Sequence, residues 1–134
     1  MGAMEREHEP HRTGGDDHAQ ARREREAQDR LLDLGADRLE ERPWRPAPAP
    51  PTAIDLAQFA LWRSADLDSD DLLAALSLMP AARAEVEGVE IGLLFTARNA
   101  GLTWAQIAEA TGFRSPQACQ QHYMRMSARQ EDRS

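Results

Sequence analysis

The chain contains no lysine, one cysteine and few aromatic residues. These shortages limit the kind of core that it can build and the compartment in which it can work. All 16 basic residues are arginine, a bias that translation of a GC-rich genome explains without a functional cause. The single cysteine, Cys119, excludes an internal disulfide and fits a reducing compartment. Aromatic residues make up 5%, so Leu, Ala, Ile and Val must build any core. No apolar run approaches the roughly 18 residues of a membrane span, and no signal-peptide pattern is visible, which favours a cytoplasmic protein.

The chain is acidic overall, but its charge is unevenly distributed. The net charge of −7 argues against nucleic acid as a partner, because attraction to phosphate supplies most non-specific affinity. Residues 52–97 carry two arginines against eight acidic residues, whereas residues 98–134 carry five arginines against three. Only the C-terminal segment is positive, so it would present one basic face to DNA while the opposite face repels it.

The first 51 residues predict a charged tail rather than a part of the core. Residues 1–18 contain almost nothing to bury and are expected to be disordered. Residues 19–41 predict a marginal charged helix that either frays in solvent or forms only on a partner. Five prolines in residues 43–51 forbid a helix and predict an extended linker. The folded domain is therefore expected to span residues 52–134.

Capping residues and apolar periodicity predict that this domain is all-α, with about five helices. Thr52 with Asp55, and Ser69 with the two aspartates that follow it, are typical of helix N-termini. Pro80 is expected to be the first residue of a long helix that ends at Gly101. The buried face of that helix is predicted from apolar residues at three- and four-residue steps: Val86, Val89, Leu93, Leu94 and Ala97.

The stretch GLTWAQIAEATGFRSPQACQQHYMRM, residues 101–126, predicts a helix-turn-helix. Thr103 is the expected cap of a short helix, WAQIAEAT, and Gly112 is expected to stop it. Ser115 is the expected cap of the last helix, which should run to about Ala128. The domain therefore ends in a pair of capped helices joined by a glycine turn.

The last helix divides into two sides when it is read at about 100° per residue. One side suits a core and holds Cys119, His122, Tyr123 and Met126. The other has no acidic residue and holds Gln117, Gln120, Gln121, Met124, Arg125 and Ala128. Glutamine can make paired hydrogen bonds to adenine, and arginine does so to guanine. The second side therefore indicates a surface that reads base edges.

The quoted stretch resembles the helix-turn-helix of small actinobacterial DNA-binding proteins, and it is also similar in outline to Myb-like repeats. The resemblance covers about residues 89–127 and implies a three-helix unit whose last helix reads the major groove. By position it implies DNA contacts from Arg114, Ser115, Gln117, Gln120, Gln121 and Arg125. Arg129 extends the basic side of that helix, and Thr103 and Gln106 begin the preceding helix, which in this motif crosses the DNA backbone.

These patterns predict a DNA-binding protein of the nucleoid, either a transcriptional regulator or a nucleoid-associated factor. No nucleophile–base pair, phosphate loop or complete metal-ligand set is visible, so we expect no enzymatic activity, metal or cofactor. A single DNA-binding unit of this size makes few contacts with double-stranded DNA, so we expect a homodimer or tandem binding along DNA. Residues 53–63 and 69–79 are candidates for self-association.

Two alternatives stay open from the sequence. The helix pair could bind a protein of the transcription machinery, such as a sigma factor or a polymerase subunit, instead of DNA. The acidic residues of the first 50 positions could also fold over the arginine-bearing face and compete with DNA. Deleting residues 1–50 would then tighten DNA binding.

Overall fold

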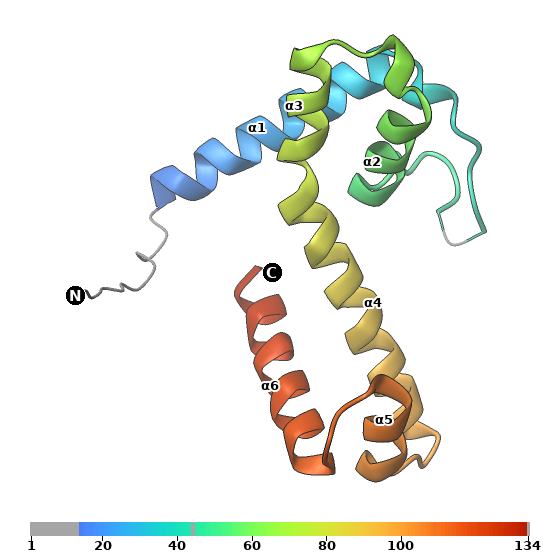
Figure 1. Ribbon diagram of the computed structural model, residues 1–134, viewed down its shortest axis with the longest axis vertical. Coiled ribbons are helices and arrows are strands. Elements are labelled where there is room, and N and C mark those ends of the chain that lie inside the picture. Colours follow the sequence, from blue (N-terminus) through green and yellow to red (C-terminus); the bar gives the residue numbers. More distant parts are fainter. Residues whose placement is uncertain (1–13, 44, 134) are drawn as a thin grey trace. The chain divides into compact units, whose positions relative to one another are not determined.

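The computed structural model describes residues 14–43 and 45–133, in which the regular elements are helices (Figure 1). Its α-helices are α1 (Gly14–Asp33), α2 (Ala53–Trp62), α3 (Ser69–Ser77), α4 (Met79–Asn99), α5 (Trp104–Thr111) and α6 (Pro116–Arg133). The predicted all-α class, with five helices after residue 52, is confirmed. None of the described helices combines the length and the apolar character that crossing a bilayer requires. The chain divides into two compact units, residues 1–79 and 80–134, and not after residue 51 as predicted.

The helix α1 belongs to the fold of the first unit and is not a marginal tail helix. It begins at Gly14, inside the segment expected to be disordered, and it packs on α2 and α3 with Ala27 and Leu31 buried. These two residues lie one turn apart, so they form a narrow apolar edge within a charged sequence. Packing of that edge offsets the low intrinsic stability of the helix. The rest of the predicted disordered segment, residues 1–13, lies outside the described residues.

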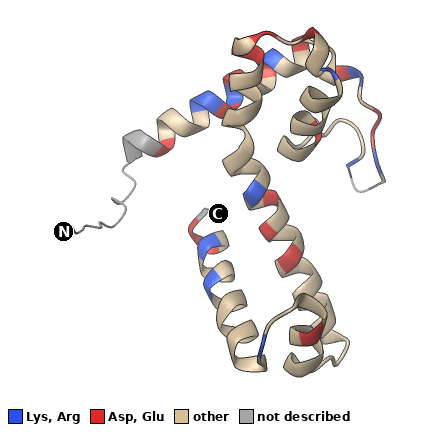
Figure 2. Cartoon of the chain, viewed as in Figure 1, with Lys and Arg blue, Asp and Glu red and all other residues tan. Residues whose placement is uncertain are grey.

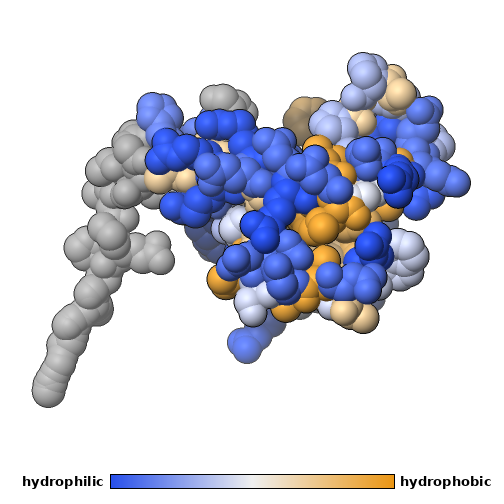
Figure 3. Space-filling view, turned by 90° about the horizontal axis from the view of Figure 1, so that it is seen from above, coloured by the Kyte–Doolittle hydropathy of each residue, from blue (hydrophilic) through white to orange (hydrophobic). Residues whose placement is uncertain are grey.

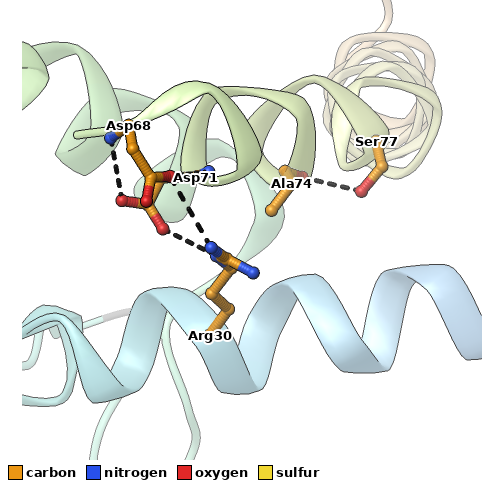
Figure 4. Close-up of polar contacts among 5 residues, drawn as sticks. All are labelled: Arg30, Asp68, Asp71, Ala74 and Ser77. Atoms are coloured by element: carbon orange, nitrogen blue, oxygen red, sulfur yellow. Dashed lines mark hydrogen bonds and ion pairs between the residues drawn. The ribbon is translucent and has the colours of Figure 1, made fainter.

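An ion pair joins α1 to the start of α3 (Figure 4). Arg30 Nε lies 2.6 Å from Asp71 Oδ1, and Arg30 Nη2 lies 3.6 Å from Asp68 Oδ1. The hydrogen bond from Arg30 lowers the pKa of Asp71, and the same bond raises the pKa of Arg30. The pair therefore favours the charged form of both groups and helps to hold α1 against α3.

The N-cap of α3 is Asp68, whereas the sequence predicts Ser69. Asp68 Oδ1 accepts a hydrogen bond from the Asp71 amide at 2.8 Å, and Asp71 Oδ2 accepts one from the Asp68 amide at 3.1 Å. This reciprocal box requires the partner carboxylate three residues after the cap. Asp71 is three residues after Asp68 and only two after Ser69. Asp68 is therefore the cap, and Ser69 is the first residue of the helix.

The described residues of the proline-rich segment are non-helical, as predicted, and Arg45 attaches them to α2. Arg45 is buried, with Nε 3.0 Å from Asp55 Oδ2 and Nη2 donating to the Glu40 carbonyl oxygen at 2.9 Å. Asp55 also forms the predicted capping box with Thr52, whose Oγ1 accepts a hydrogen bond from the Asp55 amide at 3.2 Å. One carboxylate therefore fixes both the start of α2 and the path of the chain that leads to it.

The second unit consists of α4, α5 and α6 around one apolar cluster. The buried members of the cluster are Ile107, Ala108, Cys119, Tyr123 and Met126, and the residues packed against them are Ile91, Leu94, Ala97, Trp104 and Phe113. The helices α4 and α6 run in opposite directions (Figure 1), and polar contacts join them where α6 ends. Arg129 Nη2 lies 3.1 Å from Glu87 Oε2, and Gln130 Nε2 donates to the Ala84 carbonyl oxygen at 3.1 Å.

The buried face of α4 differs in part from the prediction. Leu94 and Ala97 pack on the cluster as expected, but Val86, Val89 and Leu93 are exposed. At about 100° per residue these three lie on a neighbouring stripe of the same helix. Both stripes repeat at steps of three or four residues, so spacing alone does not say which of them faces the core.

Candidate nucleic-acid interface

The helix α5 begins and ends at the residues that the sequence predicts. Thr103 Oγ1 accepts a hydrogen bond from the Gln106 amide at 3.1 Å, and Gln106 Oε1 accepts one from the Thr103 amide at 2.8 Å. Gly112 follows the helix with φ 83°, a left-handed conformation that glycine adopts without steric cost. The Phe113 amide then donates to the Ala108 carbonyl oxygen at 2.9 Å, which closes the helix end and turns the chain toward α6.

The helix α6 is fixed at both ends. Ser115 Oγ accepts a hydrogen bond from the Ala118 amide at 3.1 Å, which confirms Ser115 as the cap. The helix continues to Arg133, beyond the predicted end near Ala128. The contacts of Arg129 and Gln130 with α4 account for the extra length, because they stabilise a segment that has little apolar content of its own.

One side of α6 packs in the core, as the sequence predicts. Cys119, Tyr123 and Met126 are buried. His122 is half-buried, and its ring centroid lies 4.9 Å from that of Phe113 and 5.1 Å from that of Tyr123. Burial, together with the nearby charge of Glu90, raises the pKa of Tyr123. This side therefore orients the helix.

The opposite side of α6 is exposed along its whole length. Its exposed residues are Gln117, Gln120, Gln121, Met124, Arg125 and Ala128, and Glu131 and Asp132 continue it in the last turn. The side chains of the three glutamines and of Arg125 make no hydrogen bond or ion pair to other residues in the described part of the chain. Since the core and both helix ends fix the backbone, these side chains are presented on a rigid support with their donors and acceptors free for another molecule.

Figure 2 shows where the charged residues lie along the chain. The four arginines between residues 98 and 129 fall into two groups. Arg114 and Arg125 are exposed and form no ion pair within residues 14–43 and 45–133. Arg129 is paired with Glu87 at 3.1 Å. Arg98 donates to the Leu102 carbonyl oxygen at 2.8 Å, and its guanidinium carbon lies 5.1 Å from the centre of the Trp104 ring. Two of the four positive charges are thus exposed without a partner, and two also support the fold.

The remaining predicted site residues take part in helix capping. Thr103 and Gln106 are exposed, but each side chain accepts a hydrogen bond from the other residue's amide. Ser115 is half-buried at the start of α6. The sequence missed the contact between Arg98 and Trp104, since no helical spacing connects two residues across the turn at Gly101.

The chain matches no family model, no curated protein and no solved structure. Its function therefore has to be argued from the surface of the second unit. That surface combines amide groups and unpaired positive charge on one side of a fixed helix.

Proposed function

We propose that α6 binds double-stranded DNA in the major groove and that the protein acts as a transcriptional regulator or a nucleoid-associated factor. The observation that carries this proposal is the exposed, amide-rich side of α6 from Gln117 to Ala128, where no acidic residue lies. Gln117, Gln120 and Gln121 present amide groups that match base edges. Because the helix is already rigid, little ordering is needed when it binds.

The two unpaired arginines fit phosphate contacts at the edges of a groove. Arg114 lies just before the N-terminus of α6, where the helix dipole and free amides favour an anion. Arg125 lies nine residues after Pro116, which corresponds to about 14 Å along the helix axis. The major groove is about 12 Å wide, so the two side chains are spaced to reach phosphates on either side of it.

The test is a fluorescence-anisotropy titration of the full chain against random-sequence duplex DNA at 50 and 200 mM salt. Two phosphate contacts predict a slope of about −1.8 for log K against log salt, or about 12-fold weaker binding at the higher salt. The double variant Arg114→Ala/Arg125→Ala should lose this slope. The matched control Arg38→Ala removes an exposed arginine of the first unit and should keep it. Absence of binding by the full chain at 50 mM salt would reject the proposal.

A second candidate function is binding to a protein of the transcription machinery, such as a sigma factor or a polymerase subunit. Large apolar side chains are exposed on α2 and α3: Leu61, Trp62, Leu72, Leu73 and Leu76. Apolar groups also reach the surface among hydrophilic ones in Figure 3, and such patches are typical of protein interfaces. Binding to purified RNA polymerase that is lost in Leu73→Glu/Leu76→Glu and kept in Gln120→Ala would favour this function over DNA binding.

A further inference from the structure

The helix α4 carries a second apolar stripe that its own unit does not use for the core. The stripe consists of Val86, Val89 and Leu93, which are 47%, 63% and 66% exposed, and we call it the α4 stripe. Thr96 and Ala100 continue it and are also exposed. The Thr96 hydroxyl donates to the Gly92 carbonyl oxygen at 2.9 Å, so its hydrogen-bonding need is met and its methyl group can pack against another surface.

The spacing of the α4 stripe is that of a helix that pairs with another helix. Its residues follow one another at steps of three, four, three and four positions, which is the alternation of the two apolar positions in a coiled-coil heptad. The stripe is narrow, because the adjacent face of α4 packs on the cluster through Ile91, Leu94 and Ala97. A single helix covers such a stripe.

The charges that flank the stripe favour a second copy of the same helix in the opposite direction. Arg83 and Glu90 lie on one flank, and Glu85 and Gly92 lie on the other. In a parallel pair, opposite flanks meet, so Arg83 of one copy would not face Glu90 of the other. In an antiparallel pair, like flanks meet, so the exposed Arg83 of each copy faces Glu90 of the other, which is half-buried beside Tyr123.

We propose that the protein forms an antiparallel homodimer through the α4 stripe. In the register that pairs Arg83 with Glu90, Val86 of each copy packs against Val89 of the other across the two-fold axis. In the same register, Leu93 lies opposite Ala82 of the other copy. Ala82 is already buried within its own chain, so the apolar contact ends at Leu93. The dimer does not depend on DNA binding. If α6 also binds DNA, two copies related by a two-fold axis would read a palindromic pair of half-sites.

The first experiment measures the oligomeric state of the full chain by sedimentation velocity from about 1 to 200 μM at 50 mM salt. We expect a reversible dimer, and Val89→Glu should raise its Kd by at least about 100-fold by placing two charges at the centre of the interface. Met124→Glu is the matched control, because Met124 is equally exposed, at 63%, but lies on α6. A chain that stays monomeric at 200 μM overturns the proposal, and so does a dimer that Val89→Glu leaves intact.

The second experiment tests the direction of the pair with single charge reversals. Arg83→Glu and Glu90→Arg should each raise the dimer Kd by about tenfold, because each turns two attractive pairs into repulsive ones. An equimolar mixture of the two variants should restore tight association, because both cross pairs of the heterodimer are then opposite in charge. A mixture that associates no better than its components overturns the antiparallel pair, as does tighter association of Glu90→Arg alone. Circular dichroism of each variant checks that it is folded.

A third outcome separates the dimer from a contact within one chain. If the full chain is monomeric and Val89→Glu lowers its Tm, the stripe is covered by the chain's own residues and the proposal fails. If the chain is dimeric, the effect of Val89→Glu on Tm should grow with protein concentration, because dissociation is concentration-dependent.

Discussion

Replacing Arg125 by alanine is expected to weaken binding to every DNA sequence and to flatten its dependence on salt. Arg125 is exposed on α6 and forms no ion pair to the rest of the described chain. Its charge can therefore meet a phosphate without breaking an existing contact, and its removal leaves the buried side of α6 intact. The expected loss is electrostatic and carries no sequence preference.

The size of this loss follows from the release of counterions. Each phosphate contact contributes about 0.9 to the slope of log K against log salt. Counted from 1 M salt, where this contribution vanishes, one contact is worth about 15-fold in affinity at 50 mM salt and about fourfold at 200 mM. Arg125→Ala should raise the Kd by these factors in anisotropy titrations with two duplexes of unrelated sequence.

Arg129→Ala is the comparison on the same helix. Arg129 is paired with Glu87 at 3.1 Å, so a phosphate has to compete with that carboxylate. The loss should again be the same for all sequences but smaller, below about fivefold at 50 mM salt. The reasoning is refuted if Arg125→Ala keeps the full salt slope, or if Arg129→Ala weakens binding more than Arg125→Ala does.

Three further predictions concern base readout and stability. Gln121→Ala should alter the preferred sequence found by selection from random duplexes while leaving binding to random DNA nearly unchanged; an equal loss on every sequence would contradict base readout. Met126→Ala should lower the free energy of unfolding by about 2–5 kcal/mol in urea titrations, because Met126 of α6 is buried in the apolar cluster of the second unit; a loss below about 1 kcal/mol would show that this cluster does not hold α6. Because the pKa of Asp71 is lowered in the folded chain, its stabilising effect should be complete above about pH 5 and lost as the pH falls below about 4. Asp71→Asn should flatten this acid dependence, and an unchanged pH profile would contradict the role of the Arg30 pair.

The helix ends of the second unit could be predicted because their causes are local. Thr103, Gly112 and Ser115 act through hydrogen bonds or backbone conformations that span a few residues. The division of α6 was also predictable, since the helix has one apolar side. By contrast, the pairing of Arg129 with Glu87 joins residues 42 positions apart, and no local pattern indicates it.

The predictions for α1 and α4 differed from the structure for opposite reasons. In α1 the packed residues, Ala27 and Leu31, are too few to stand out from a charged sequence, and only the surfaces of α2 and α3 reveal their role. In α4 there are more apolar residues than one core face needs. Periodicity identifies an apolar face of a helix but not the surface that covers it. Apolar positions beyond those that one core face needs therefore indicate a second contact surface. The exposed Val89 and Leu93 are that excess.

An acidic chain and a DNA-binding face are compatible because electrostatic interactions in solution are short-ranged. At 0.1 M ionic strength the Debye length is about 10 Å, so a phosphate close to Arg114 or Arg125 is influenced mainly by charges on the nearest turns of helix. From Gln117 to Ala128 the exposed side of α6 has no acidic residue, although the chain as a whole carries −7 and Glu131 and Asp132 follow in the last turn of the helix. The distant carboxylates would then oppose non-specific attraction to DNA, which leaves the base-facing glutamines a larger share in the choice of site.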